Sequence, residues 1–395
     1  MGDRLKIFTP LRIIAAVAAA FLALPIFRSY TERFVLVQSI HLLLLSFLLC
    51  YILVPLCILF GKKVGLIDSP DEDRKKHILP TPLTGGIAIY VSFVATVLLN
   101  FHFSMEVKGI LFSSSLILAV GLIDDRWAVP ANFRLAVQLL ASLIVIGFGV
   151  HMTFIPKSLG GIYFKNIAET VMTAIWFIGI TNSMNFIDGM DGLAAGSAII
   201  YSFFFALIAI ITKQTYMMFL TIAIAGSCVG FFIYNFRRDK PALIFLGDSG
   251  STFLGFLLAA FAIEGEWGKS IIDIVIPILI MSVLIFDMTL TTVLRIYKKE
   301  VRNFSEWVRY TGRDHFHYRL AGLGLTRAQS TMIFFGVSIC FGVEALAILF
   351  ADVLVSLLIL LHSILTFIIF GLLLVLPKNK RDTKKFAKLE PETKG

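Results

Sequence analysis

A long apolar run ends in a cluster of amide and carboxylate side chains. Asn182, Asn185, Asp188 and Asp191 follow one another at intervals of three residues, so they share one face for as long as a helix lasts. An ionisable group near hydrocarbon is costly unless it is compensated. A hard cation such as Mg²⁺ takes oxygen ligands and keeps positions for substrate, so it would supply the compensation. The alternative is a polar helix cap with two solvated aspartates.

A second acidic motif closes another apolar run. Asp124 and Asp125 are adjacent and are followed by Arg126. Neighbouring side chains on a helix point in different directions, so the two acids need not act alike. One would reach a metal or a proton while the other orients a cation such as Arg126. A solvated pair of carboxylates is the alternative.

A third motif, residues 245–251, opens an apolar run after a basic loop. Backbone donors freed by its glycines suit a phosphate group. Asp248 would share a metal ion with Asn185, and Phe245 would stack on a base. An ordinary helix cap is the alternative for Asp248.

Two loops carry basic clusters. Residues 74–77, Arg-Lys-Lys-His, precede a Pro-Thr-Pro-Leu-Thr-Gly-Gly turn at 80–86. Such a basic run beside a membrane often only fixes the orientation of the chain in the bilayer or binds anionic lipid. The turn is predicted to fix the loop where it re-enters the membrane, and its glycines permit close backbone packing.

The other basic loop contains Arg313, His315, His317 and Arg319. The His-x-His pair suggests zinc, but no cysteine, and no other histidine on that side except His77, completes a tetrahedral site. The four side chains together favour a clamp for pyrophosphate.

Asp287 lies inside the preceding apolar run, and an intramembrane acid is functional by default. A structural pairing of Asp287 with Arg295 is the alternative. Together, these acids, amides and basic clusters are the types of side chain that metal-assisted phosphoryl transfer requires.

The composition indicates the class of protein to which these residues belong. Of 395 residues, 58% are hydrophobic and 15% charged, and the mean hydropathy is +0.88, which excludes an ordinary soluble globular domain. The four cysteines lie inside apolar runs without a CxxC pair, so they are interpreted as packing residues. The net charge of +9 is explained by membrane topology, and no nucleic-acid partner is predicted.

The apolar runs predict an all-α, polytopic integral membrane protein with about 11 transmembrane helices, or 12 if the run from Ile13 to Phe27 also spans. That short run is also compatible with a signal peptide or a tilted or re-entrant segment. Three parts are predicted: an N-terminal extension (1–33), a membrane domain (34–376) and a basic tail (377–395). The predicted spans are 34–60, 83–101, 107–123, 135–155, 167–187, 193–212, 217–236, 251–263, 271–294, 329–350 and 353–376.

The orientation of the chain in the membrane is predicted from its Lys and Arg residues, because cytoplasmic loops carry an excess of them. Alternate loops collect 28 of the 35 Lys and Arg on one side and 7 on the other. Every motif above lies on the basic side. The chemistry is therefore expected to face the cytoplasm, at the inner membrane of the cell.

In this order the motifs resemble the polyprenyl-phosphate N-acetylhexosamine-1-phosphate transferases, over about Val64 to Leu325. This superfamily contains the bacterial enzymes that start O-antigen and teichoic-acid synthesis, the peptidoglycan translocase MraY and the eukaryotic dolichol-phosphate enzyme. Asp287 also matches an acid commonly found there in the span before the His-x-His element.

The resemblance implies roles for individual residues. Asn185 and Asp248 would hold Mg²⁺, with Mn²⁺ as a substitute. Asp124 and Asp125 would sit at the reacting phosphates, and the other implied catalytic residues are Asp188, Asp191, His315 and His317. The implied substrate-binding residues are Lys76, His77, Gly189, Met190, Asp191, Asn235, Phe245, Arg313 and Arg319.

The implied reaction transfers an N-acetylhexosamine-1-phosphate from a UDP-sugar to an undecaprenyl-type phosphate. It yields a lipid pyrophosphate sugar and UMP, as the first membrane step of a cell-envelope glycan pathway. Whether an aspartate deprotonates or orients the lipid phosphate, or forms an aspartyl-phosphate, stays open.

The histidine-rich element favours UDP-N-acetylglucosamine as the donor, because the MraY branch would show three consecutive histidines followed by Phe-Glu. Three departures keep the sugar open: Tyr318 replaces a usual histidine, Gly312 a frequent aspartate, and residues 236–240 are an insert before Pro241.

The rival hypothesis is a transporter of nucleotide-sugars or lipid-linked sugars. It requires polar sites near the midplane and on both faces, often with duplicated halves. This chain keeps its polar motifs on one face and shows no repeat. The oligomeric state, including a homodimer, stays open.

Overall fold

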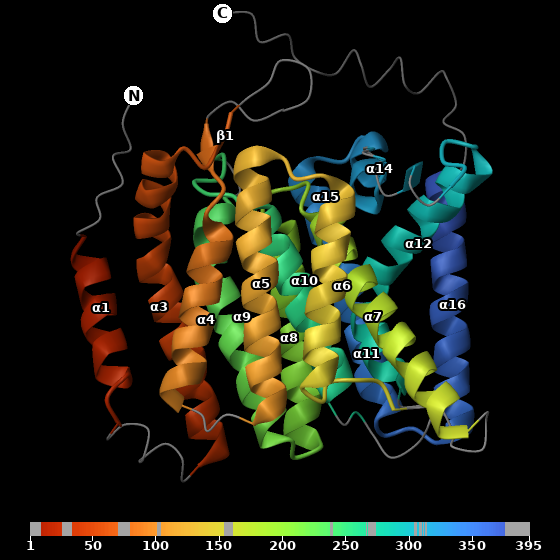
Figure 1. Ribbon diagram of the computed structural model, residues 1–395, viewed down its shortest axis with the longest axis horizontal. Helices are drawn as coiled ribbons and strands as arrows, with labels where there is room; N and C mark the ends of the chain where they lie inside the picture. Colours follow the sequence, from red (N-terminus) through yellow and green to blue (C-terminus); the bar gives the residue numbers. More distant parts are fainter. Residues whose placement is uncertain are drawn as a thin grey trace, which may run out of the picture.

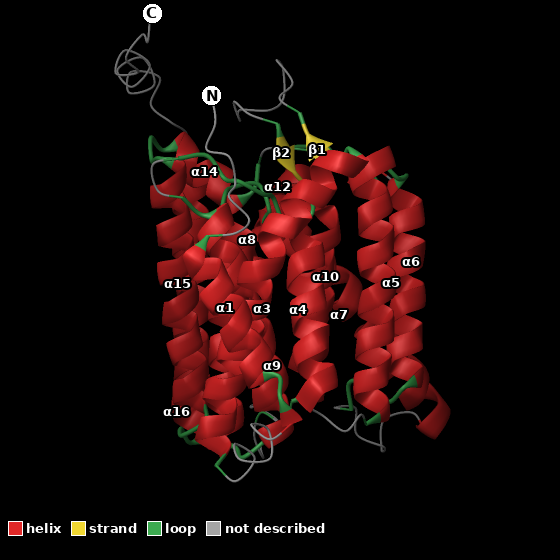
Figure 2. Cartoon of the chain, turned by 90° about the vertical axis from the view of Figure 1, so that its left-hand side faces the viewer, coloured by secondary structure: helices red, strands yellow, loops and turns green. Residues whose placement is uncertain are grey.

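The computed structural model describes residues 9–25, 34–69, 80–100, 104–153, 161–237, 240–265, 267, 274–303, 306–307, 310, 312 and 314–375. The described part is a bundle of helices with one short hairpin, so the all-α prediction is confirmed. Figures 1 and 2 show the long helices side by side, with the hairpin and helix α14 at the same end of the bundle.

Helices coincide with all of the predicted spans. The ninth, 271–294, is broken at Met281 into two helices. The helices are α1 (Pro10–Leu22), α3 (Val35–Val64), α4 (Gly85–Asn100), α5 (Met105–Trp127), α6 (Ala131–Gly147), α7 (Gly161–Ile187), α8 (Leu193–Ile211), α9 (Thr215–Asn235), α10 (Gly247–Glu264), α11 (Val275–Ile280), α12 (Ser282–Tyr297), α14 (Phe316–Gly322), α15 (Arg327–Ile348) and α16 (Val353–Val375).

Length separates the helices into two groups. Seven of the described helices are long and apolar enough to cross a membrane, and α4 and α6 are shorter apolar helices. Helix α1 has 13 residues and covers only about 20 Å at 1.5 Å per residue. A bilayer core is about 30 Å thick, so a straight α1 does not cross it.

Close approaches to α10 bring three helices together at the end that carries the motifs. A Cβ added at Gly121 of α5 would lie 2.3 Å from the Ser249 Cα, and one at Gly255 of α10 would lie 2.8 Å from the Thr181 Cα of α7. Because only glycine fits at such distances, α5, α10 and α7 pack backbone against backbone. The rings of Phe177 and Phe256 stack beside them, with centroids 4.6 Å apart.

The turn at 80–86 docks a small hairpin onto the start of α10. Strands β1 (Ile67–Asp68) and β2 (Thr81–Pro82) pair antiparallel. The Phe245 N–H donates to the Pro82 carbonyl (2.8 Å), and the Gly85 N–H donates to the Phe245 carbonyl (3.0 Å). A Cβ at Gly86 would lie 2.5 Å from the Gly250 Cα, so the predicted close glycine packing is confirmed.

Candidate active site

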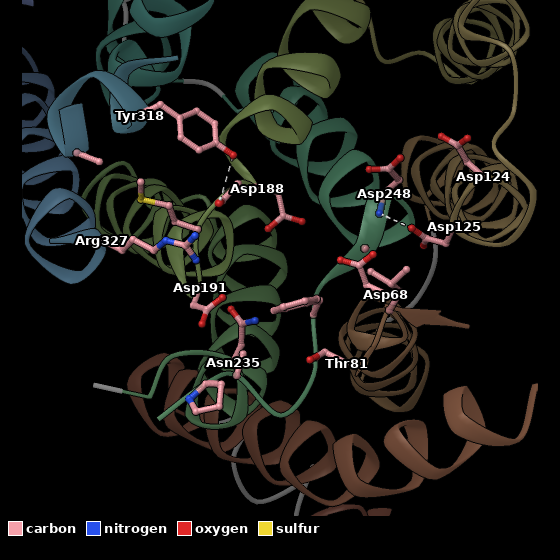
Figure 3. Close-up of a pocket in the computed structure, with 18 of the residues that line it drawn as sticks. Asp68, Thr81, Asp124, Asp125, Asp188, Asp191, Asn235, Asp248, Tyr318 and Arg327 are labelled. Carbon is pink, nitrogen blue, oxygen red and sulfur yellow. Dashed lines mark hydrogen bonds between the residues drawn. The ribbon is translucent and has the colours of Figure 1, made fainter. Parts of the chain in front are cut away.

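A cavity of about 960 Å³ opens at the end of the bundle that carries the hairpin and α14. Six aspartates line it, and Figure 3 shows them around the opening, with Asp188 and Asp191 on one side and Asp125 and Asp248 on the other. They are Asp68, Asp124, Asp125, Asp188, Asp191 and Asp248. The structure therefore brings together acids that are up to 180 positions apart in the chain.

Asp125 caps the first turn of α10 from the neighbouring helix α5. Its carboxylate accepts the N–H of Asp248 (2.7 Å) and of Ser249 (3.1 Å). Gly247 has φ +78, and a Cβ there would lie 2.7 Å from Asp125 Oδ2, so the contact needs glycine. The alternative in which Asp248 caps the helix is wrong, because Asp248 is the second residue of α10 and lines the cavity instead.

Asp124 has a different partner from its neighbour. Its carboxylate accepts from the Val129 N–H (2.6 Å) and from Arg134 of α6 (2.7 Å). The same Arg134 nitrogen lies 3.5 Å from Asp248 Oδ2. The two acids have different partners, and the cation that Asp124 contacts is Arg134 and not Arg126.

Asn185 joins α7 to the start of α10. Its amide nitrogen donates to Asp248 Oδ1 (2.9 Å) and to the Ser251 hydroxyl (2.9 Å). Asn182, one turn earlier, instead donates to Gln138 Oε1 of α6 (2.7 Å). Helix α7 ends at Ile187, so the shared helical face predicted for this motif stops before its two aspartates.

Asp188 lies among the acids just beyond α7. Burial, together with the charges of Asp248, Asp125 and Asp191, raises the pKa of Asp188 well above its ordinary value. Repulsion between carboxylates that share a site is relieved by a proton or by a cation among them. The site therefore favours a positive ligand.

The donor set fits Mg²⁺. Among the described residues, no three His, Cys, Asp or Glu side chains are grouped so that they alone hold a metal ion. Mg²⁺ usually takes one or two carboxylates together with waters and substrate phosphates, so a protein-only cage is not required. Asp248, whose side chain is 44% exposed, offers carboxylate oxygen atoms at the cavity wall. Asn185 contacts Asp248 through its amide nitrogen and is not among the described residues that line the cavity.

Five of the predicted substrate-binding residues line the cavity: Gly189, Met190, Asp191, Asn235 and Phe245. The amide of Asn235 is committed to the backbone, since it accepts the Gly192 N–H (2.7 Å) and donates to the Ile244 carbonyl (2.8 Å). Asn235 therefore shapes the wall by tying the start of α8 to the segment before α10. Lys76 and His77 lie outside the described residues.

The basic clamp predicted around the His-x-His element is not what the structure shows. His315 and His317 are 4% and 0% exposed, and Arg319 Nε donates to the Asp314 carbonyl (2.6 Å). These three do not appear among the described residues that line the cavity. Burial removes the two histidines from the wall, whereas Arg319 is only partly buried. Arg313 lies outside the described residues.

Among the described lining residues that were not predicted as site residues, four have polar or charged side chains: Asp68, Thr81, Tyr318 and Arg327. Asp68 and Thr81 face each other in the hairpin register, which only the docked loop reveals. Arg327 is the only Lys or Arg among the described lining residues. It begins α15 after the capping residue Thr326, where a basic residue carries no local signal of a site.

Known proteins resemble this chain in sequence. The family description "Glycosyl transferase family 4" matches residues 107–266. A probable undecaprenyl-phosphate N-acetylglucosaminyl 1-phosphate transferase of Bacillus subtilis (strain 168) is 30% identical over 328 residues, covering 82% of this chain and 89% of the relative.

Two further relatives have different names. A decaprenyl-phosphate N-acetylglucosaminephosphotransferase of Mycolicibacterium smegmatis is 28% identical over 301 residues, with 69% of this chain and 73% of the relative covered. A phospho-N-acetylmuramoyl-pentapeptide-transferase of Streptococcus pneumoniae serotype 2 is 30% identical over 347 residues, with 79% and 98% covered. The chain belongs to the superfamily of polyprenyl-phosphate N-acetylhexosamine-1-phosphate transferases, as a multi-pass membrane protein.

Proposed function

We propose that this protein transfers N-acetylglucosamine-1-phosphate from UDP-N-acetylglucosamine to an undecaprenyl-type phosphate. A phosphate oxygen of the lipid attacks the β-phosphorus of the donor, the bond from that phosphorus to the UMP oxygen breaks, and UMP leaves. One pyrophosphate linkage replaces another, so we expect the reaction to be reversible.

The observation that carries the proposal is the contact between Asn185 and Asp248 at the wall of an acid-lined cavity. Mg²⁺ bound there would neutralise the phosphates and favour attack at phosphorus. The relatives whose names specify N-acetylglucosamine support the donor and the lipid acceptor.

The remaining residues act through charge and position. Arg134 bridges Asp124 and Asp248, and its guanidinium would compensate an incoming phosphate on the α6 side of the acids. Asp125 holds the first turn of α10 and so orients Asp248. Arg327 would attract the anionic donor at the opposite side of the cavity, as its place in Figure 3 suggests.

The test is an assay of the purified protein with undecaprenyl phosphate and Mg²⁺. UDP-N-acetylglucosamine, UDP-N-acetylgalactosamine and UDP-MurNAc-pentapeptide are compared as donors, and UMP release is measured. We expect release with the first donor and UMP-dependent exchange of label in the reverse direction. Transport of intact UDP-sugar into sealed vesicles without UMP release would reject the proposal.

Asp248→Ala is the matching test of the metal assignment. We expect loss of exchange by about 100-fold or more, the scale of removing one main electrostatic contact at a reacting centre. Asp352→Ala, at the start of α16, is the control and should keep full exchange. Full exchange by Asp248→Ala would overturn the metal assignment.

A further inference from the structure

Asp287 is a buried carboxylate that the proposed reaction does not use. It lies in α12, is 1% exposed and is absent from the described lining of the cavity. Its Oδ2 lies 3.0 Å from His315 Nδ1, and its Oδ1 accepts the Phe316 N–H (2.5 Å). One carboxylate thus holds two consecutive residues where α14 begins, and the alternative pairing with Arg295 is not the one present.

The neighbours of His315 determine where its ring proton lies. Its Nε2 is 3.4 Å from a terminal nitrogen of Arg295, and a guanidinium only donates. Arg295 is itself held by Asp314 through bonds of 2.8 and 2.7 Å. His315 Nε2 must therefore present its lone pair to Arg295, so the ring proton is on Nδ1 and is donated to Asp287.

The ring of His315 lies against the helix that carries the candidate metal ligand. It stacks on Phe186, with centroids 4.9 Å apart and an angle of 30° between the rings. Phe186 follows Asn185 directly in the last turn of α7. On the other side of Asp188, a Cβ at Gly189 would lie 2.7 Å from His317 Nε2. His315 and His317 therefore lie against the chain before and after this acid, respectively.

We propose that Asp287 is a positioning residue that fixes His315 in its Nδ1–H tautomer, and that the His315 ring in turn holds Asn185 and Asp188 at the cavity. His315 then supports the site from behind and does not bind the donor phosphates. The kinetic part of this inference rests on the proposed function, whereas the tautomer and the metal affinity are measured without it. Partners that orient such a site typically change metal affinity or activity by about 10- to 100-fold when removed.

The first experiment is nitrogen-15 NMR of the full chain labelled only at histidine. The His315 signal is identified as the one lost in His315→Gln. We expect the Nδ1–H tautomer at neutral pH in the wild type, and a change of tautomer in Asp287→Asn, whose amide donates to Nδ1. An Nε2–H tautomer or an imidazolium in the wild type would overturn the proposal.

The second experiment measures Mn²⁺ binding by electron paramagnetic resonance, together with transfer kinetics. Asp287→Ala and His315→Gln should each lower Mn²⁺ affinity and kcat by about 10- to 100-fold, with KM for UDP-N-acetylglucosamine unchanged. The double variant should be no worse than the poorer single one, because the two residues act as one unit. Phe186→Leu should give the same losses and leave the tautomer as it is.

Glu344→Gln is the matched control. It removes another histidine–carboxylate pair, His362 Nδ1 to Glu344 at 2.9 Å, between α15 and α16, and should change neither Mn²⁺ affinity nor kinetics. If His315→Gln raised KM with Mn²⁺ affinity intact, His315 would contact the substrate and the proposal would fail. If the wild type showed the Nδ1–H tautomer and the variants lost Mn²⁺ affinity as expected, but the wild type catalysed no transfer, only the proposed function would be rejected.

Discussion

Among the described residues that line the cavity, Arg327 has the only guanidinium and lies with six carboxylates. A nucleotide diphosphate entering it meets repulsion that Mg²⁺ at one side and Arg327 at the other would offset. A hydrogen bond to a charged group contributes about 1.5–3 kcal/mol. Arg327 is therefore expected to contribute to donor affinity more than to the chemical step.

We accordingly expect Arg327→Ala to raise KM for UDP-N-acetylglucosamine by about tenfold or more, with kcat little changed. Arg327→Lys should recover part of the affinity, because it keeps the charge but not the planar fork. Steady-state kinetics with saturating lipid phosphate measure both constants. An unchanged KM in Arg327→Ala would show that this side chain does not contact the donor.

His317 gives the site a pH-dependent stability. Burial, opposed by the Asp287 charge and aided by His315, lowers the pKa of His317 to about 4, against about 6.5 in an unfolded chain. Between these values the unfolded state binds the proton and the folded state does not. Stability is therefore present above about pH 6.5 and is lost as the pH falls toward 4, by about 3 kcal/mol at most.

The measurement is the thermal unfolding midpoint of the purified protein at pH 7.5 and pH 5. The wild type should lose more stability on acidification than His317→Gln, which has no group to protonate at this position. Comparing the two cancels the titration of the other groups. Equal acid sensitivity would mean that His317 takes up its proton without penalty.

At the scale of elements, the site depends on helices that approach closely. Asp124 and Asp125 reach Asp248 because Gly121 lets α5 lie against the first turn of α10, where an added Cβ would be 2.3 Å from the Ser249 Cα. The neighbour at that distance is backbone and cannot rotate away. A larger residue must move one helix relative to the other.

Gly121→Ala should therefore lower stability by about 1–3 kcal/mol, the usual cost of overpacking, and reduce UMP release because Asp125 no longer reaches the Asp248 N–H. Gly179→Ala in α7 is the control, since a Cβ there meets nothing within 4 Å. It should be neutral or slightly stabilising in a helix interior. Thermal unfolding and the transfer assay on both variants measure the difference.

At the scale of the whole molecule, the hairpin and α14 lie at one end of the bundle (Figure 2), and residues of both line the cavity. We propose that this end faces the cytoplasm, because the segments 61–82, 124–134, 237–250, 295–328 and 377–395, which the predicted topology puts on that side, carry 25 of the 35 Lys and Arg. The chain returns to the opposite end after α6, where His151 is exposed.

In sealed membrane vesicles of known orientation, a membrane-impermeant maleimide should label Ser69→Cys only from the cytoplasmic side and His151→Cys only from the other. Cys340→Ser provides the background, because Cys340 is the exposed one of the four native cysteines. The reverse labelling pattern would place the active site on the outer face and would reject a cytoplasmic donor.

The sequence by itself determined the helical membrane architecture, because a continuous apolar run in hydrocarbon has to satisfy its backbone as a helix. It also indicated acids that line the cavity, since Asp124, Asp125, Asp188 and Asp248 stand out against their apolar surroundings. Local pattern and solvation energy decide these features without any long-range contact. The break of the ninth span at Met281 was not predicted, although Pro277 lies four residues before it.

Only the tertiary structure decided how these residues are paired. Arg134 takes the place expected for Arg126, Asp287 binds His315, and the two histidines are buried behind the site instead of lining it. Partner choice among charged groups depends on distances between helices, which close glycine contacts set and which linear spacing does not encode. For the same reason Arg327 became a candidate only once α15 was seen to reach the cavity.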